Sequence, residues 1–245
     1  MVFGMTNWMT RLPQDTKNKW QTAHTGQPNV MTREAVLRYY SNPKNSSALL
    51  NDIVGKRTMI YSMFDGKRTL IRKHNGKPIV IRRISGDGPD SIEYWARRHA
   101  VDFHRTLSGN EPEAMIDIDP NSVDMDRVKR VTADISKKVG DIVRNQTIQF
   151  SGNRGFYIRG ESKSMPAAKN EILKLVKEYV SKNKDVVLTR PASGEIRIDF
   201  APMKRLGTHR AVNSLDMRTG LRSMTVGDLD GFVPSRDALP DAGGK

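Results

Sequence analysis

The feature that most constrains the fold is an alternation of strand-like and helix-like segments over residues 114–200. Apolar residues recur at every second position in some segments and every third or fourth in others, the periods of strands and helices. The expected strands are 114–119, 147–150, 155–159, 186–189 and 195–200, and the expected helices run from Ser122 to about Arg144 and onward from Pro166. Without one extra hairpin strand this is the split β-α-β order of an α+β, ferredoxin-like fold, in which the first and last strands lie side by side.

The preceding segment predicts a smaller antiparallel sheet. Apolar runs at 59–64, 69–71 and 79–84 are separated by Asp65-Gly66 and Asn75-Gly76, and such dipeptides favour tight hairpins. We expect a three-stranded meander with a basic outer face made of Arg57, Lys67, Arg68, Arg72, Lys73, Lys77, Arg82 and Arg83. A short helix should follow Thr32, and a longer one is expected from Asp90 to Leu107, with an apolar stripe of Ile92, Trp95, Ala96, Ala100 and Phe103.

These patterns divide the chain into four parts. Residues 1–30 are polar and rich in turn residues, and we expect a flexible arm or cap. An N-terminal α/β subdomain with the basic meander is expected over 31–110, and a second domain over 111–240. The closing 241–245 segment is expected to be disordered.

Charge and composition narrow the function classes. Among 245 residues, 41 Lys and Arg against 27 Asp and Glu give a formal net charge of +14, so a polyanionic partner is expected. Charge alone leaves DNA, RNA and anionic lipid open as partners.

The absence of Cys excludes disulfides, thiolate zinc sites and cysteine nucleophiles. With no apolar run near the roughly 18 residues of a membrane span, and no apolar signal-peptide core, we expect a cytoplasmic protein, nucleoid-associated or, in a eukaryote, nuclear.

Three acidic residues fall at positions where the predicted topology brings them together. Asp117 and Asp119 share one face of their strand, and Asp199 takes the same alternating position on the last strand. Because those strands are predicted neighbours, the three carboxylates should converge and bind Mg²⁺ or Mn²⁺, and a pair of such ions supports nucleotidyl transfer. The alternative is that Asp-x-Asp before Pro120 is only a strand end and turn.

Two further segments suit a phosphate ligand. The loop from Phe150 to Phe156 contains glycines, backbone amides and the donors Ser151 and Arg154, although a bare hairpin needs no function. A basic segment follows Asp199, and its alternative interpretation is a solvated cationic surface. Its members are Lys204, Arg205, His209, Arg210, Arg218 and Arg222. Of the five histidines only His104 and His209 are retained as candidates.

These residues resemble the motifs of the archaeo-eukaryotic primase superfamily. Met115-Ile-Asp-Ile-Asp-Pro120 is similar to its hydrophobic-Asp-hydrophobic-Asp metal motif, and Phe150-Ser-Gly-Asn-Arg-Gly-Phe-Tyr157 to its Ser-Gly-x-x-Gly-x-His motif. Ile196-Arg-Ile-Asp199 and the segment 210–221 resemble the third metal Asp and the Arg-x-x-x-Ser-Leu-His-x-Lys-Thr-Gly-Leu stretch of primase small subunits. Residues 228–239 resemble the end of those subunits, and Asp102-Phe-His104 resembles the polymerase domains of bacterial end-joining ligases.

The resemblance implies an RRM-like catalytic core with two Mg²⁺ or Mn²⁺ ions and template-directed nucleotide addition. Asp117, Asp119 and Asp199 would be the catalytic metal ligands. The implied nucleotide-binding residues are Ser151, Gly152, Arg154, Tyr157, Arg210, Ser214, Arg218 and His104. The implied partners are a DNA template or primer, nucleoside triphosphates, and a primase large subunit or a DNA ligase and Ku-type end-joining partner, with no membrane and no zinc. On the meander, Arg68, Arg72, Lys73, Arg82 and Arg83 are expected to bind the nucleic-acid backbone.

Two departures from the family pattern leave a second hypothesis open. Tyr157 and Asp216 stand where the family has nucleotide-binding histidines. The chain is therefore either a DNA primase/polymerase or a catalytically weakened nucleic-acid-binding subunit of a replication or end-joining complex. A sheet-based RNA binder is disfavoured, because the outward sheet positions hold Asp and Arg and aromatic residues are only 7% of the chain.

Overall fold

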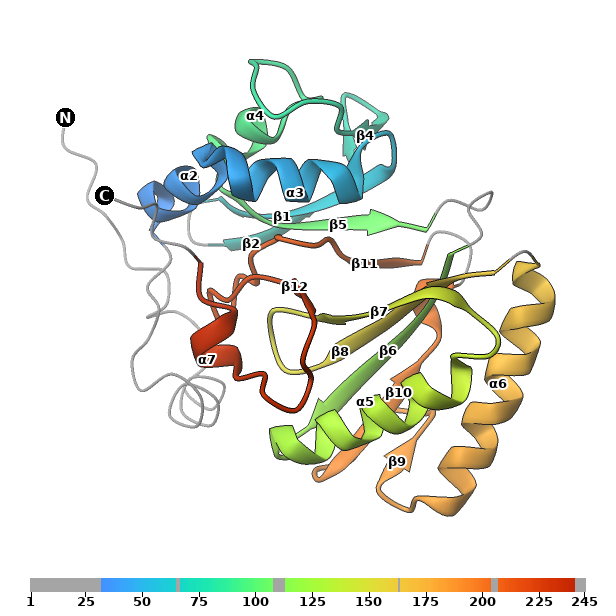
Figure 1. Ribbon diagram of the computed structural model, residues 1–245. Coiled ribbons are helices and arrows are strands. Elements are labelled where there is room, and N and C mark those ends of the chain that lie inside the picture. The colour runs from blue at the N-terminus through green and yellow to red at the C-terminus, as the bar shows by residue number, and fades with distance from the viewer. Residues whose placement is uncertain (1–31, 65–66, 108–112, 163, 204–206, 241–245) are drawn as a thin grey trace. The chain divides into compact units, whose positions relative to one another are not determined.

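The computed structural model describes residues 32–64, 67–107, 113–162, 164–203 and 207–240 (Figure 1). The expected arm at 1–30 and tail at 241–245 lie outside these ranges. The chain divides into two compact units, and each is described by itself. The N-terminal unit comprises Met1–Arg105, Arg210–Ser223 and Val233–Lys245, and the central unit comprises Thr106–His209 and Met224–Phe232. Segments of the expected 111–240 domain thus belong to the N-terminal unit.

The N-terminal unit is built from short helices and a small sheet. Its elements are α2 (Arg33–Ser41), α3 (Pro43–Ile53), β1 (Arg57–Phe64), β2 (Lys67–Ile71), β3 (Lys73–His74), β4 (Lys77–Val80), α4 (Ile92–Ala96), β5 (Ala100–Thr106) and α7 (Pro234–Asp237). The helix predicted after Thr32 is confirmed, and the Thr32 side chain caps it by accepting a hydrogen bond from the Ala35 amide. α3 was not predicted, although Asn42 caps it and Pro43 occupies its first turn.

The predicted meander is correct only in part: β1, β2 and β4 overlap the three expected strands, but β4 ends at Val80, β3 was not predicted, and the strand order differs. Asn75 and Gly76 both have positive φ and join β3 to β4, as the predicted tight turn requires. The other turn, 65–66, lies outside the described residues. β4 pairs with β1 at Arg57 and Thr58 rather than with β2, which pairs with β1 from Ile60 to Phe64. β1 is long enough to pair with both, so the order is β5-β1-β4-β3 with β2 beside β1.

The predicted helix from Asp90 to Leu107 is wrong. α4 covers only its first part, His99 has a φ of 60°, and β5 follows as a strand that pairs with β1. β5 is buried on both faces, so it lacks the alternation that identifies a strand. The apolar spacing matched a helix only because Ala100 and Phe103 fill the core from a strand.

The central unit has the predicted split β-α-β order. Its elements are β6 (Glu113–Asn121), α5 (Met125–Val139), β7 (Arg144–Phe150), β8 (Phe156–Glu161), α6 (Met165–Lys182), β9 (Val186–Val187), β10 (Glu195–Asp199), η2 (Ala201–Met203) and β12 (Met224–Val226). The sheet order is β12-β7-β8-β6-β10-β9, so the first and last strands of the motif, β6 and β10, are neighbours. β11 (Thr208–Arg210) lies where the chain passes between the units.

One face of this sheet is covered by α5 and α6 (Figure 1). Ile116, Ile118 and Ile198 are fully buried with apolar residues of the two helices, which are Val128, Val131, Ile135, Ile172 and Val176. Alternation along the strands therefore assigns the odd-numbered residues of β6 and β10 to the other face, which we call the site face.

Three details of the central unit differ from the prediction. α5 is capped by Asp124, which accepts from the Asp126 and Arg127 amides, whereas Ser122 has a φ of 60° outside the helix. α5 ends at Val139 rather than Arg144, where β7 begins. β9 runs parallel to β10, so these two strands do not form a hairpin. Within the described ranges, no helix has the length and apolarity required to cross a membrane.

Candidate active site

The structure places the three predicted carboxylates on adjacent strands of the central unit. The register of β10 against β6 puts Asp199 directly opposite Asp117, and Arg197 directly opposite Asp119. Directly opposed residues share a face, so all four side chains lie on the site face. The three aspartates therefore share one face of neighbouring strands, as the topology predicted, and Arg197 lies among them as a fourth residue to which the prediction gave no role.

Two arginines lie among these carboxylates. The Arg154 Nε is 3.1 Å from the Asp119 Oδ1, and the Arg197 Nη2 is 3.3 Å from the Asp119 Oδ2 and 3.4 Å from the Asp199 Oδ2. The backbone amide of Ala201 donates to the Asp199 Oδ1 at 2.8 Å. All of these side chains are partly exposed, between 26% and 30%, and so remain open to solvent. We call Asp117, Asp119, Asp199, Arg154 and Arg197 the sheet cluster.

The donor chemistry of the sheet cluster suits a hard divalent cation, since its candidate ligands are carboxylate oxygens. The arrangement, however, is one of ion pairs: in the part of the chain that the structure describes, no three His, Cys, Asp or Glu side chains are grouped as a metal site. A divalent cation would have to replace the arginine contacts of Asp119 and Asp199.

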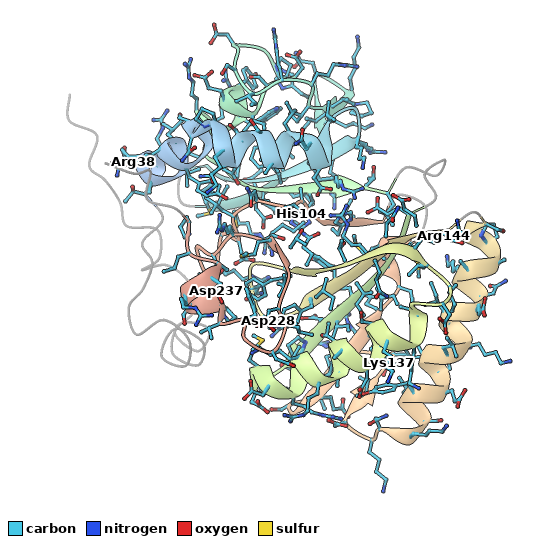
Figure 2. The ribbon with its side chains drawn as sticks, viewed as in Figure 1. Arg38, His104, Lys137, Arg144, Asp228 and Asp237 are labelled. Carbon is cyan, nitrogen blue, oxygen red and sulfur yellow. The ribbon has the colours of Figure 1, made fainter. Side chains whose placement is uncertain are left out.

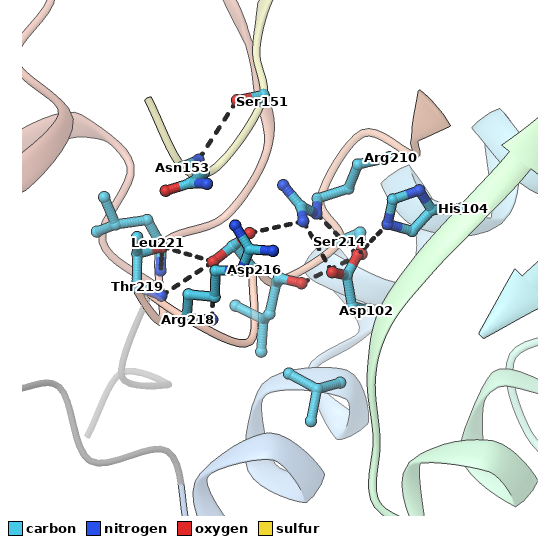
Figure 3. A network of polar contacts seen from close by, with 12 residues as sticks. Asp102, His104, Ser151, Asn153, Arg210, Ser214, Asp216, Arg218, Thr219 and Leu221 are labelled. Atoms are coloured by element: carbon cyan, nitrogen blue, oxygen red, sulfur yellow. Dashed lines mark hydrogen bonds and ion pairs between the residues drawn. The ribbon is translucent and has the colours of Figure 1, made fainter. Parts of the chain in front are cut away.

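The loop from Ser151 to Gly155 holds Arg154 in place. The Ser151 amide donates to the Gly155 carbonyl at 2.9 Å, and the Ser151 Oγ accepts from the amides of Asn153 and Gly155 (Figure 3). Gly152 has a φ of 85°. A Cβ at Gly155 would lie 2.1 Å from the Ile118 carbonyl oxygen, so only glycine allows this approach to β6. The amides of Asn153 and Gly155 are thus directed at Ser151, and the loop directs Arg154 toward Asp119.

Tyr157 occupies the position of the motif histidine and lies beside the carboxylates. It is opposite Asp117 in the β6–β8 register and is nearly buried. Its ring packs edge-to-face on the imidazole of His209, with centroids 5.9 Å apart. The imidazole of His209 therefore lies next to the position at which the motif has its histidine, although His209 is not part of that motif.

Three of the remaining nucleotide-binding candidates, His104, Arg210 and Ser214, contact a buried polar network of the N-terminal unit (Figure 3). The Arg210 guanidinium binds Asp102 through Nε at 2.7 Å and Nη2 at 2.8 Å, and its Nη2 is 2.6 Å from the Asp216 Oδ2. The His104 Nε2 is 2.9 Å from the Asp102 Oδ1. The Ser214 Oγ accepts from the Phe103 amide at 2.6 Å. We call Asp102, Arg210 and Asp216 the buried network.

Charge in the buried network is balanced by arginine. Burial by itself would raise the pKa of Asp102, but the Arg210 guanidinium and the neighbouring His104 outweigh it and hold that pKa below its usual range. The Asp102 side chain is 0% exposed and that of Asp216 is 2% exposed. Asp102 was not predicted, because its partner Arg210 lies 108 residues away in sequence, and the ion pair of Asp216 with Arg210 was not predicted either.

Asp216 also shapes the turn that follows it. Its Oδ1 accepts from the amides of Arg218 and Thr219 at 2.8 and 2.9 Å, and Gly220, with a φ of 72°, completes the turn. The Asp216 carboxylate is therefore bound to Arg210 and to the backbone of this turn. Arg218 itself is exposed.

The predicted nucleic-acid-binding residues of the meander all reach solvent. These exposed residues are Arg68, Arg72, Lys73, Arg82 and Arg83. Arg68 lies over the Tyr61 ring at 4.2 Å, and Arg83 pairs with Asp90 at 2.8 Å. The central unit has basic side chains on its helices as well, including Lys137 on α5 (Figure 2).

Comparison with known proteins identifies a fold but no family. No protein-family model matches the chain, and no curated protein does. Among solved structures, the polymerase domain of Mycobacterium tuberculosis Ligase D in complex with DNA matches with a TM-score of 0.66 at 15% identity, over 97% of this chain and 91% of that one. At that identity the match shows a shared α+β, polymerase-domain-like fold.

Proposed function

We propose that this chain is a template-dependent nucleotidyltransferase, a DNA primase/polymerase that joins nucleotides on a DNA template with two Mg²⁺ or Mn²⁺ ions. One observation carries the proposal. Asp117, Asp119 and Asp199 share the site face on neighbouring strands, within a fold that matches a DNA-bound polymerase domain.

The proposal gives each element of the central unit a role. Asp117, Asp119 and Asp199 would hold the cations, which when bound activate an attacking hydroxyl and stabilise the leaving pyrophosphate. Arg154 is placed beside Asp119 by a loop that needs Gly155, so it can turn from carboxylate to triphosphate as a nucleotide arrives. Tyr157 supplies a hydroxyl next to Asp117, but it provides no positive charge at neutral pH.

In the N-terminal unit the proposal separates two kinds of basic residue. The exposed arginines and lysines of the meander suit a DNA backbone, and their contribution should weaken as salt rises. Arg218 is exposed and can reach a phosphate. Arg210 and Ser214, by contrast, are buried in their own network, so their part in nucleotide binding would be to shape the segment that presents Arg218.

The test is primer extension with labelled nucleotides on a defined DNA template. Asp117→Ala should lower incorporation about 100-fold or more, because the proposal makes this carboxylate a direct ligand of the reactive centre. Asp141→Ala is the matched control, an exposed aspartate of the same unit, and should leave incorporation unchanged. Equal incorporation by wild type and Asp117→Ala would refute the proposal. Templates with and without a primer distinguish priming from gap filling.

A second candidate is a catalytically weakened nucleic-acid-binding subunit. It is favoured by the ion pairs that engage Asp119 and Asp199 with Arg154 and Arg197. It predicts DNA binding that is unchanged in Asp117→Ala, together with no metal-dependent incorporation by the wild-type protein.

A further inference from the structure

We propose that Arg197 is a built-in competitor of the divalent cations: its guanidinium binds the carboxylates that a cation would need, and so sets the cation affinity of the sheet cluster. The inference rests on the proposed function, which makes Asp117, Asp119 and Asp199 the cation ligands. It assigns a specificity-determining role to a residue outside the motif aspartates.

The contacts of the carboxylate oxygens carry the argument. The Oδ1 of Asp119 faces Arg154, and its Oδ2 faces Arg197. The Oδ1 of Asp199 accepts from the Ala201 amide, and its Oδ2 faces Arg197. All four oxygens of these two side chains therefore have a partner, and a single nitrogen, the Arg197 Nη2, lies within 3.4 Å of both carboxylates. A positive charge already occupies the position between them.

The charge balance explains why the arginine is held there. Three aspartates and two arginines leave the sheet cluster with one net negative charge (3 − 2). Without Arg197, Asp119 and Asp199 would lose the positive charge that lies between them and would repel each other more strongly. A bound divalent cation would replace this neutralisation, but it would also be repelled by a guanidinium at this distance, so both cannot bind fully at once.

Arg197 is also able to leave. Its contacts to Asp119 and Asp199 are long, at 3.3 and 3.4 Å, and its side chain is 30% exposed. Its Nε is buried and, among the described residues, has no hydrogen-bond partner. The guanidinium is therefore held by one long hydrogen bond to Asp119 and by its ion pair with Asp199, and a cation with greater charge can displace it.

Strand alternation and the pairing of β10 with β6 together place Arg197 between Asp119 and Asp199. In Ile196-Arg-Ile-Asp199 the residue two positions before Asp199 must share its face, and the β10–β6 register puts that residue opposite Asp119. A neutral residue at position 197 would leave the aspartates as they are and remove the competitor.

The test measures Mn²⁺ binding directly, by electron paramagnetic resonance of free Mn²⁺, on the full chain without nucleotide or DNA. Arg197→Gln should bind Mn²⁺ about tenfold or more tightly than wild type, because a nearby positive charge is removed. Lys137→Gln is the matched control. Lys137 is an exposed residue of α5, which covers the other face of the sheet, so its removal should change the affinity less than about twofold.

Thermal unfolding with and without Mn²⁺ tests the same inference when Mn²⁺ binding is too weak to titrate. Without metal, Arg197→Gln should melt at a lower temperature than wild type, and saturating Mn²⁺ should raise its melting temperature by more than that of wild type. Adding Asp119→Asn to Arg197→Gln should abolish the gain in affinity, which locates the Mn²⁺ at the sheet cluster.

Three results would overturn the inference: equal Mn²⁺ affinity in wild type and Arg197→Gln, no binding by either, or a gain that survives Asp119→Asn. Its failure is distinct from failure of the proposed function. If primer extension depends on Asp117 but wild type and Arg197→Gln bind Mn²⁺ equally, the competition by Arg197 is refuted and the proposed function stands. If Arg197→Gln binds Mn²⁺ more tightly but neither protein incorporates nucleotides, the proposed function is refuted and the competition stands.

Discussion

The two units use the same pair of residue types, aspartate and arginine, in opposite surroundings. In the buried network, Arg210 lies between Asp102 and Asp216, and all three side chains are at most 9% exposed. In the sheet cluster, Arg197 lies between Asp119 and Asp199, and these side chains are 26% to 30% exposed. The contact pattern is similar, whereas the access of water and ligands is not.

This difference in exposure indicates which arginine can release its carboxylates to a ligand. A buried charge that loses its partner remains desolvated, so the cost of separation is high and the pair acts as part of the fold. A half-exposed pair exchanges its partner for water at little cost, so its carboxylates stay available to a ligand. Burial, rather than residue type, therefore separates the structural cluster from the candidate site.

The largest expected effect comes from Asp102→Asn. This change leaves Arg210 with a single carboxylate in a buried position, and we expect the free energy of unfolding to fall by about 3 kcal/mol or more. Urea unfolding followed by the fluorescence of the buried Trp95 measures it, with Trp8 and Trp20 replaced by Phe. The control is Asp87→Asn, whose partner Arg97 is exposed, and it should cost under about 1 kcal/mol.

The same variant has a defined pH signature. Because the pKa of Asp102 is lowered in the folded protein, its stabilising contribution is present above the unfolded value of about 3.9 and is lost as the pH falls through the folded value. The difference between wild type and Asp102→Asn should thus be constant from pH 7 to about 5 and shrink below about 4. A difference that shrank on the alkaline side instead would contradict the role of Asp102 as an ionised partner.

An intermediate effect is expected from Gly155→Ala, which tests how the loop that bears Arg154 is attached to the sheet. The new Cβ would collide with the Ile118 carbonyl oxygen, and the backbone must move to relieve the clash. We expect a loss of about 1–3 kcal/mol in the free energy of unfolding. Gly227→Ala is the matched control, since a Cβ there meets no heavy atom within 4 Å, and it should be close to neutral. Equal losses in the two variants would mean that the loop is not held by this contact.

The sequence was sufficient for the order of the central unit because its signals are local. Strand alternation, Pro166 at a helix start and the connection order predicted that β6 and β10 are neighbours, and from that the shared face of Asp117 and Asp199. It was not sufficient where long-range pairing decides the conformation. β5 has helical apolar spacing and became a strand because β1 offered it hydrogen bonds.

The candidate site shows the same limit. Residues that act through strand position were found from the sequence, whereas residues that act through a distant partner were not. Asp102 is the example, because its partner Arg210 lies 108 residues away in sequence. Arg197 was given no role from the sequence, because its contact with Asp119 depends on the register between two strands that are far apart in the chain.

The smallest effect on stability is expected from Asp119→Asn, the sheet-cluster counterpart of Asp102→Asn. The substitution removes the negative charge that Arg154 and Arg197 share, but both guanidinium groups remain near water, so the free energy of unfolding should change by less than about 1 kcal/mol. Circular dichroism in urea measures this change. Under the proposed function, primer extension by the same variant should nevertheless fall as steeply as for Asp117→Ala, since Asp119 would be a cation ligand. A loss of stability as large as that of Asp102→Asn would mean that the sheet cluster is also part of the fold, and that partial exposure does not make its carboxylates available to a ligand.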